Sequence, residues 1–536
     1  MPATATEPSA TSSLLPLAAL SAGVVCLVGL EELIRIQRKK NQKQVANSPS
    51  AEDTNKQATR GVHGISAEEG KALRDPPCVP LSIAESLAQF GDPKLPLLYA
   101  HWRDELESEV YYYQLPLGKR IYVVTDWTCF PQLLGADGLE KATAFRAFDL
   151  RRGGSLSKTE WSIFSRRTVG EGWHPIRKAL APAFATKALA TKVPAYHRSL
   201  GGFCGALDKA AAEGVSVPMD QWALRLTIDV IGETAFGYSF HAFDEGRNGD
   251  ALTFLDGVDY MLKFLTDNIY NPLKPYMLWH KDVREFHAKQ RAVREICEKV
   301  DKHFIDTPIE QRDPTSIMSY IHKAPYEDYY ERLADVYILL IAGHDTTGYS
   351  LAWGIYHLAS NPLVLKKLQQ ELDGASFAGE FPNYDELSSL TYFNAVVKEI
   401  MRITTVASNG QFRAVDRGVK LTSKGVDYYI PPGYEVVVPF LPTLTAADIW
   451  GDGKVFRPER WLEASEEQLK LYNKVMQPFG VGPRACIGQN LATIEIRLTL
   501  AALFRRYWFE VTTEPEPYFA ITYKPRGLQV KPIKRT

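Results

Sequence analysis

The chain is poor in cysteine, with six in 536 residues, and no two of them form a Cys-x-x-Cys pair. A disulfide framework and a paired-thiol zinc or redox motif are therefore not indicated. The formal net charge is −1, so there is no basic excess that would release counterions from a nucleic acid. These absences indicate reduced thiols in a protein that faces the cytosol, and they give no reason to expect a nucleic-acid partner.

One long apolar run stands out, LLPLAALSAGVVCLVGL, from Leu14 to Leu30. Its length is at the short end of a helix that crosses a bilayer. Residues 1–13 contain no Lys or Arg, whereas five basic residues follow the run between positions 35 and 43. Positive residues mark the cytosolic flank, and a cleaved secretory signal carries its charges before the apolar run. We therefore predict a short lumenal segment at 1–13 and a single transmembrane anchor at 14–30, with an organelle-targeting peptide as the weaker alternative.

The rest of the chain divides at a proline-rich stretch. Residues 31–75 are polar and predict a flexible linker. Pro76 and Pro77 stiffen the backbone, so we predict that one folded domain spans 76–536. Helix-like apolar spacing and short β-like pieces together predict a mainly helical domain with small sheets, rather than alternating βαβ units. The helical segments are Trp222–Gly237, Val283–His303 and Tyr330–Ser360, and the β-like ones are Arg120–Thr125, Tyr428–Ile430, Glu435–Val438 and Tyr518–Tyr523.

The stretch FGVGPRACIG, residues 479–488, places one cysteine in a glycine-rich loop. Neither a histidine nor a second cysteine lies in this loop to act as a base or to complete a zinc site. Its glycines permit positive φ and close approach of the backbone, Arg484 adds positive charge, and a following helix directs its dipole at the loop. A single thiolate held in this way and facing a flat apolar group suits an axial haem ligand at Cys486. The alternative is a structural cysteine in a tight turn.

The segment AGHDTT, Ala342 to Thr347, lies inside a long helical stretch. The Thr346 hydroxyl can bond the carbonyl of residue 342, and the Ala342–Gly343 pair leaves room for a small ligand. Asp345 beside Thr346 could relay protons. The alternative is a kinked, buried helix with satisfied hydroxyls, and His344 is expected to be a packing residue.

Two further pairs have helical spacing. Glu399 and Arg402 are three residues apart, so their side chains can form an ion pair, which alone would be an ordinary surface pair. Trp173 and Arg177 are one turn apart and together suit a carboxylate, unless they form a half-buried stack.

The pattern Phe479-x-x-Gly482-x-Arg484-x-Cys486-x-Gly488 resembles the haem-binding signature of the cytochrome P-450 family in full. The other motifs occur in the family's order: the Trp173 pair, AGHDTT, the Glu399 pair and FRPERW at 456–461. Together they cover residues 76–534. The resemblance departs from the usual pattern at 403–412, which lacks the prolines that normally follow the Glu-x-x-Arg helix.

The resemblance implies the cytochrome P-450 fold and a haem b whose iron is held by the Cys486 thiolate. It also implies that Asp345 and Thr346 deliver protons, and that three other motif residues form a structural triad that holds the cysteine loop. Glu495 is expected to be an ion-pair partner within its helix. The haem-binding residues implied are Trp173, Arg177, Arg413, Phe479, Arg484 and Gly488, and the triad is Glu399, Arg402 and Arg460.

The resemblance further implies a monooxygenase in the endoplasmic reticulum membrane, with its catalytic domain in the cytosol. Electrons would come from NADPH through a separate reductase, since the sequence shows no flavin or iron–sulfur domain. The substrate would be a lipophilic small molecule of the fatty acid, sterol or terpenoid class, hydroxylated or epoxidised. The alternatives are a haem-thiolate isomerase that needs no electron donor, and a non-catalytic membrane-tethered haem protein. The aromatic stretch Tyr270–Trp279 is expected to dip into the membrane.

Overall fold

A computed structural model describes residues 64–82, 85, 92–115, 118–142, 146, 161–268 and 274–535. The chain divides into two units, Met1–Gly61 and Val62–Thr536, and only the second contains described residues. The expected anchor at 14–30 and part of the aromatic stretch, residues 270–273, lie outside them. Among the helices of the described ranges, none combines the length and apolar character needed to cross a membrane.

Helices make up most of the described chain, as the sequence predicts. The longer ones are α5 (Leu95–Glu105), α7 (Trp173–Leu180), α9 (Val193–Glu213), α10 (Met219–Ile231), α11 (Gly249–Asn268), α12 (Lys281–Asp306), α14 (Tyr329–Ala359), α15 (Pro362–Gly374), α16 (Thr391–Ile403), α20 (Glu466–Val475) and α21 (Gln489–Arg506). The shorter ones are α3 (Ala67–Gly70), α6 (Phe130–Leu134), α8 (Thr186–Ala190), α13 (Ile317–Ile321), α17 (Phe440–Leu444), α18 (Ala447–Trp450) and α19 (Arg460–Glu463). A π-helical turn, Gly232–Phe236, extends α10, so the expected helix Trp222–Gly237 is present with a wider last turn.

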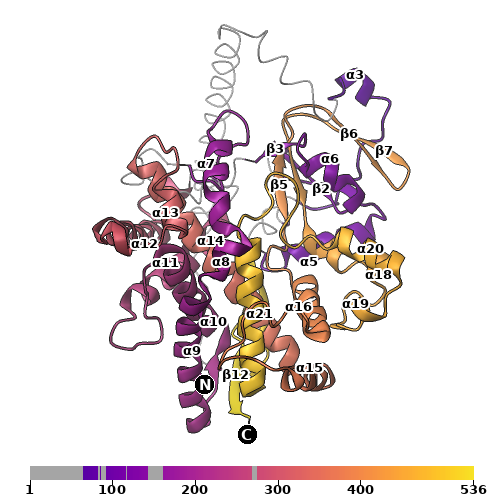
Figure 1. The fold of residues 1–536 in the computed structure, drawn as a ribbon. Helices are drawn as coiled ribbons and strands as arrows, with labels where there is room; N and C mark the ends of the chain where they lie inside the picture. Colours follow the sequence, from indigo (N-terminus) through magenta and orange to yellow (C-terminus); the bar gives the residue numbers. More distant parts are fainter. Residues whose placement is uncertain are drawn as a thin grey trace, which may run out of the picture. The chain divides into compact units, whose positions relative to one another are not determined.

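The 31-residue helix α14 contains the AGHDTT segment and runs without a break. It begins where the Asp328 side chain accepts hydrogen bonds from the N–H groups of Tyr330 and Glu331, which caps its first turn. Gly348 lets α10 approach closely, because a Cβ there would lie 2.8 Å from Leu224 Cδ2. In Figure 1, α10, α14 and α21 lie in the middle of the helices, with α11 and α12 on one side and the strands β2 and β5 on the other.

The strands form small sheets, as expected. A five-stranded sheet has the order β1-β2-β8-β5-β3, and a three-stranded sheet has the order β4-β12-β9. Two hairpins, β6–β7 and β10–β11, complete the set. The strand bounds are β1 (Val110–Gln114), β2 (Arg120–Val124), β3 (Glu140–Lys141), β4 (Val217–Pro218), β5 (Gln411–Ala414), β6 (Val419–Ser423), β7 (Val426–Ile430), β8 (Glu435–Val438), β9 (Tyr507–Thr513), β10 (Glu516–Ala520), β11 (Thr522–Arg526) and β12 (Gln529–Lys534).

The segment Tyr518–Tyr523, expected to be one strand, is instead the tip of the β10–β11 hairpin. Ala520 pairs with Thr522, so the chain reverses at the single residue Ile521. Ile521 has φ of 66°, a left-handed conformation that is rare and strained for a β-branched residue. The sequence contains no Gly or Asn here to announce a turn, which is why the reversal is not predicted.

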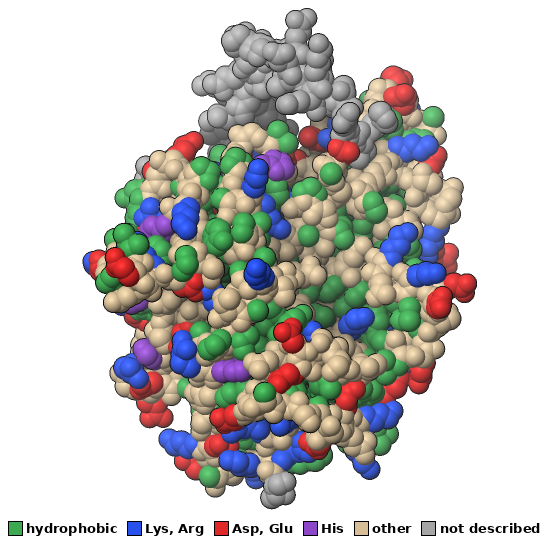
Figure 2. Space-filling model, in the orientation of Figure 1, with side chains coloured by type: hydrophobic (Ala, Val, Ile, Leu, Met, Phe, Trp, Pro, Cys, Tyr) green, Lys and Arg blue, Asp and Glu red, His purple; other side chains and the backbone are tan. Residues whose placement is uncertain are grey.

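The folded part begins before the expected boundary at residue 76. Ser66 and Glu69 form a reciprocal capping box that starts α3. The N–H of Ile65 donates to Gly418 O at 3.1 Å, and the N–H of Arg74 donates to Asp427 O at 3.0 Å. Residues 64–75 are therefore attached to the β6–β7 hairpin. On the face shown in Figure 2, acidic and basic side chains are interspersed, in keeping with the net charge of −1.

Candidate active site

A cavity of about 410 Å³ lies among α14, α7, the segment after α16 and the cysteine loop. Most of the side chains around it are apolar and come from elements far apart in the sequence. Among them are Ile163, Phe184, Ile231, Ile338, Leu339, Phe412, Phe440 and Phe519. The motif residues Trp173, Arg177, Thr346, Arg413, Phe479, Arg484, Cys486 and Gly488 also line the cavity. The structure thus brings eight of the twelve predicted site residues to one space.

The cysteine loop precedes α21, whose N-cap is Gly488, so the helix dipole points at the loop as the sequence predicts. The N–H of Cys486 donates to Phe479 O at 2.9 Å, which closes the loop on itself. Gly482 has φ of 72°, and a Cβ there would lie 2.0 Å from Leu134 O. This glycine is therefore needed for close approach to the protein's own backbone.

The Cys486 side chain is open to the cavity. Burial among protein atoms raises the pKa of its thiol, while the N–H of Gly488 and the charge of Arg177 act to lower it. A backbone N–H therefore stabilises the thiolate of Cys486, as expected. The protein groups together nevertheless leave the pKa of this thiol above its ordinary value. A metal cation would reverse that balance, because a coordinated thiol loses its proton.

Three arginines border the cavity, Arg413 buried and Arg177 and Arg484 half-buried, and none of them forms an ion pair with a carboxylate among the described residues. Burial lowers the pKa of Arg413 and of Arg484 to about 10, and burial also lowers the pKa of Arg177. Arg413 Nε is buried and has no hydrogen-bond partner among the described residues. Buried cations of this kind require an anion. The two propionate carboxylates of haem, together with the single open thiol and the apolar walls, fit this set of residues.

The three arginines already make contacts within the protein. Arg413 donates from Nη2 to Gln411 Oε1 and from Nη1 to Phe412 O. Arg177 Nη2 donates to Ala485 O at 2.9 Å. The Arg484 guanidinium lies 4.2 Å from the centre of the Trp173 ring. It also donates from Nε to Thr168 Oγ1 at 3.0 Å and from Nη1 to Ile163 O at 3.1 Å. Arg484 therefore holds the loop that includes residues 163–168 against the cysteine loop, a contact that the sequence does not announce.

On α14, the Thr346 hydroxyl donates to Ala342 O at 2.8 Å, as predicted. Asp345 is buried and does not line the cavity. Its carboxylate accepts a hydrogen bond from Thr522 Oγ1 at 2.7 Å, and Thr522 does line the cavity. Ala342 and Gly343 line the cavity, as expected, and Ile231 lines it beside them, so that a Cβ at Gly343 would lie 2.8 Å from Ile231 Cδ1.

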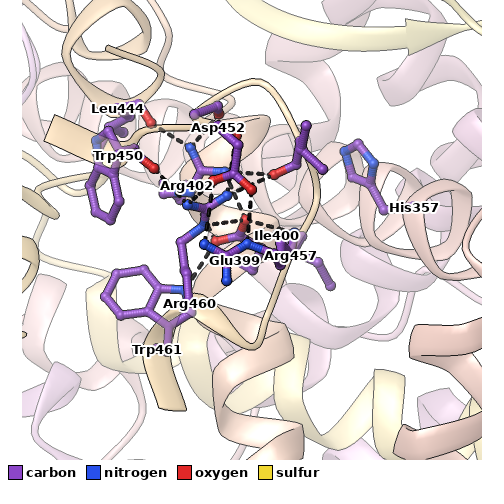
Figure 3. A network of polar contacts seen from close by, with 12 residues as sticks. His357, Glu399, Ile400, Arg402, Leu444, Trp450, Asp452, Arg457, Arg460 and Trp461 are labelled. Atoms are coloured by element: carbon purple, nitrogen blue, oxygen red, sulfur yellow. Dashed lines mark hydrogen bonds and ion pairs between the residues drawn. The ribbon is translucent and has the colours of Figure 1, made fainter. Parts of the chain in front are cut away.

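Glu399, Arg402 and Arg460 meet in a fully buried network (Figure 3). Arg402 Nη2 lies 2.7 Å and Arg460 Nε lies 2.9 Å from Glu399 Oε1. Trp461 Nε1 donates to the second carboxylate oxygen at 3.0 Å. Burial would raise the pKa of Glu399, but the hydrogen bonds and charges of the two arginines outweigh it, and the pKa is lowered.

These guanidinium groups also donate to carbonyls. Arg402 Nη1 reaches Leu444 O at 2.7 Å, and Arg460 Nη1 reaches Trp450 O at 2.9 Å. The network thus ties α16 to the chain that leads toward the cysteine loop.

Glu495 differs from its expected role as an ion-pair partner. It is 1% exposed on α21, and its Oε1 has no hydrogen-bond partner among the described residues. Burial alone raises the pKa of Glu495 well above its usual range. The sequence does not show that Glu495 lacks an ion pair, because helical spacing shows which face of the helix a residue occupies. It does not show whether a basic side chain from another helix or strand reaches that residue.

The cytochrome P450 family model matches residues 76–532. The chain is 27% identical to Protein LUTEIN DEFICIENT 5, chloroplastic, of Arabidopsis thaliana, over 68% of this chain and 63% of that protein, which is less than two thirds of its length. It is 28% identical to Cytochrome P450 3A28 of Bos taurus over 70% of this chain and 81% of that one. The chain is 26% identical to Cytochrome P450 monooxygenase claU of Ampulloclitocybe clavipes over 80% of this chain and 85% of that one.

A crystal structure of a cytochrome P450 (CYP102L1) superposes with a TM-score of 0.71 at 21% identity, over 86% of this chain and 100% of that chain, which shows the shared fold. The family model covers most of the chain, and the cavity combines one open thiol with three arginines and apolar walls. The chain therefore belongs to the cytochrome P450 family and is a haem-thiolate monooxygenase.

Proposed function

We propose that the protein hydroxylates or epoxidises a lipophilic small molecule of the fatty acid, sterol or terpenoid class, using electrons that a separate NADPH-dependent reductase supplies. The observation that carries this proposal is the cavity itself, where the Cys486 thiol faces a space with mainly apolar walls. Walls of this kind favour apolar ligands because burying their surface releases water.

In this proposal Cys486 supplies the axial thiolate, and Trp173, Arg177, Arg413 and Arg484 hold the propionates. Bound haem supplies the activation of O2, and a thiolate ligand favours O–O cleavage. Phe479 packs beside the sulfur. The triad of Glu399, Arg402 and Arg460 keeps the loop in place and takes no part in the chemistry.

The protein's other residues exclude water and move protons. Side chains such as Ile338, Leu339 and Phe412 form walls that exclude bulk water from the cavity. Thr346 presents its hydroxyl oxygen to the cavity while its proton is held by Ala342 O. Asp345, one residue before Thr346, is the acid that donates protons toward the cavity.

We further propose that residues 14–30 anchor the protein in the endoplasmic reticulum membrane, with the catalytic domain in the cytosol. The apolar run and the basic residues that follow it support this arrangement. Deletion of residues 1–30 is expected to release the protein from microsomal membranes during carbonate extraction. Full retention of the truncated protein would contradict the anchor.

A binding screen tests the substrate class. Purified haem-loaded protein is titrated with dodecanoic acid, cholesterol and limonene, and the Soret absorption is followed for each. We expect at least one to shift the band and to raise NADPH consumption in the presence of a reductase. If a ligand shifts the band but NADPH consumption stays at its basal rate, the donor-dependent reaction is wrong. If none of the three shifts the band, the proposed substrate class is wrong.

A further inference from the structure

The acid that the sequence identifies for proton delivery does not reach the cavity. Asp345 is 3% exposed and is absent from the cavity wall, whereas the neighbouring Thr346 lines it. A proton that leaves Asp345 therefore needs a group between its carboxylate and the cavity. The Thr346 hydroxyl donates to Ala342 O at 2.8 Å, and no hydrogen bond joins it to the Asp345 carboxylate in the described residues.

Thr522 occupies that intermediate place. Its Oγ1 donates to Asp345 Oδ2 at 2.7 Å, and the same residue lines the cavity. A hydroxyl has one proton to donate and two lone pairs that accept, so it can bond the carboxylate and a cavity group together. No other hydrogen bond from a side chain to Asp345 is found in the described residues.

The backbone around Thr522 is held in an unfavourable conformation. Ile521, directly before it, has φ of 66°, and Ala520 pairs with Thr522 across this one-residue turn. Such strain persists only where surrounding contacts hold it, and it is common at functional sites. Two contacts do so: the N–H of Tyr523 donates to Val406 O at 2.9 Å, and Trp353 Nε1 donates to Tyr523 O at 3.0 Å.

A buried cation lies near the same carboxylate. Lys524 follows on β11 and is 4% exposed, and its Nζ lies 2.8 Å from Oδ1 of Asp259, on α11. Burial would lower the pKa of Lys524, but Tyr349, Asp345 and Asp259 together raise it. His344, on α14 beside Asp345, stays neutral because burial lowers its pKa. Lys524, which pairs with Asp259, is therefore also a positive charge in the surroundings of Asp345.

We propose that Thr522 is a hydroxyl relay that connects Asp345 to the cavity. Before a transfer, Asp345 takes a proton from solvent on Oδ2, and the Thr522 hydroxyl turns from Oδ2 toward the cavity. Asp345 Oδ2–H then gives its proton to Thr522 Oγ1, and Thr522 gives its own hydroxyl proton to an acceptor in the cavity. Thr522 is then unchanged, Asp345 is a carboxylate, and solvent re-protonates it. This inference rests on the proposed function, since it takes Asp345 as the acid.

The test uses the full-length, haem-loaded protein with Thr522→Val, Thr522→Ser and, as a matched control, Thr512→Val. Thr512 is exposed on β9, and its hydroxyl donates to Ser216, away from the cavity. The first readout is the 13C resonance of Asp345 Cγ in aspartate-labelled, reduced, carbon monoxide-bound protein, identified by its loss in Asp345→Asn. We expect Thr522→Val to move it, and Thr522→Ser and Thr512→Val to leave it in place.

The second readout is O2-dependent NADPH consumption with a reductase, measured in H2O and in D2O without added substrate. Loss of a hydrogen bond to a charged group corresponds to a change on the order of tenfold. We expect Thr522→Val to consume NADPH about tenfold more slowly than Thr512→Val and to show a different solvent isotope effect, with recovery in Thr522→Ser.

Either of two results overturns the relay. One is a Thr522→Val protein that matches Thr512→Val in both readouts. The other is a moved Asp345 resonance with unchanged NADPH consumption, which would leave a purely structural bond. Failure of the proposed function is separate, because the unsubstituted protein itself would then show no ligand-induced Soret shift, or no rise in NADPH consumption with a ligand and a reductase.

Discussion

Arg177 donates from Nη2 to the carbonyl oxygen of Ala485 at 2.9 Å, one residue before Cys486. A guanidinium on α7 thus fixes the backbone of the cysteine loop and lies at the cavity wall at the same time. Its charge also lowers the pKa of the Cys486 thiol, although burial, the larger effect, raises that pKa.

We expect Arg177→Met to weaken haem retention, because the loop loses a donor and a propionate loses its cation. A hydrogen bond to a charged group contributes about 1.5–3 kcal/mol, which corresponds to a loss of roughly tenfold or more in haem affinity. The measurement is transfer of haem to apomyoglobin, with Arg177→Lys as the control that keeps the charge. An unchanged transfer rate in Arg177→Met would show that Arg177 does not hold the cofactor.

Glu399→Gln tests the buried triad. The substitution leaves Arg402 and Arg460 buried with no carboxylate between them, and breaking such a pair costs about 3–5 kcal/mol. We expect a drop of this size in the free energy of unfolding, measured by chemical denaturation at pH 7. Because the pKa of Glu399 is lowered, its contribution is present above the unfolded pKa and is lost as the pH falls through the folded pKa.

The variant should therefore converge on the wild type under acidic conditions. A stability difference that stays constant from pH 7 down to pH 3 would contradict the ionised state of Glu399.

The raised pKa of Glu495 predicts that the stability of the protein depends on pH in the opposite direction. Its pKa is raised by burial, so the folded protein holds a proton that the unfolded chain releases above its ordinary pKa. Wild-type stability then falls as the pH rises from that value toward the folded pKa, by at most about 1.4 kcal/mol per pH unit from this group. Glu495→Gln removes the titration, so we expect its stability relative to wild type to increase between pH 5.5 and pH 7.5.

Glu467→Gln, at an exposed position of α20, is the control and should show no such trend. Denaturation midpoints of all three proteins at both pH values provide the measurement. Parallel curves for wild type and Glu495→Gln would mean that Glu495 is ionised in the folded state.

The glycines of the cysteine loop are not equivalent. Gly482→Ala places a methyl group 2.0 Å from Leu134 O in a left-handed conformation, so the loop must move. Gly488→Ala places its Cβ 3.9 Å from Cys486 Sγ, an ordinary contact distance. We expect Gly482→Ala to lose stability by about 1–3 kcal/mol and to incorporate less haem, while Gly488→Ala retains both. Equal haem content in the two purified proteins would contradict this distinction.

The sequence predicts the fold class and eight of the residues that line the cavity, because each motif depends on local spacing that survives folding. The 3.6-residue period places α14 within one residue of its expected bounds, Tyr329–Ala359 against Tyr330–Ser360. The glycines of residues 479–488 predict the loop around Cys486, and the apolar spacing after it predicts the helix whose dipole points at that loop. The roles of these residues stay predictions until the variants are measured.

What the sequence does not show are contacts between segments that are far apart. Thr522 meets Asp345 across 177 positions. Arg484 reaches the backbone of Ile163 across 321 positions, so a local motif cannot reveal that its guanidinium is already engaged. Glu495 Oε1 has no hydrogen-bond partner among the described residues because of how α21 is packed. Ile521 turns the chain without a turn-forming residue.

The central claim is that Cys486 is the thiolate that binds the haem iron. Its most direct test is the absorption spectrum of the reduced, carbon monoxide-bound protein. We predict the strongly red-shifted Soret band of thiolate-ligated haem in the unsubstituted protein and its replacement by a band at shorter wavelength in Cys486→His. An unchanged red-shifted band in Cys486→His, or its absence from the unsubstituted haem-loaded protein, would contradict the account.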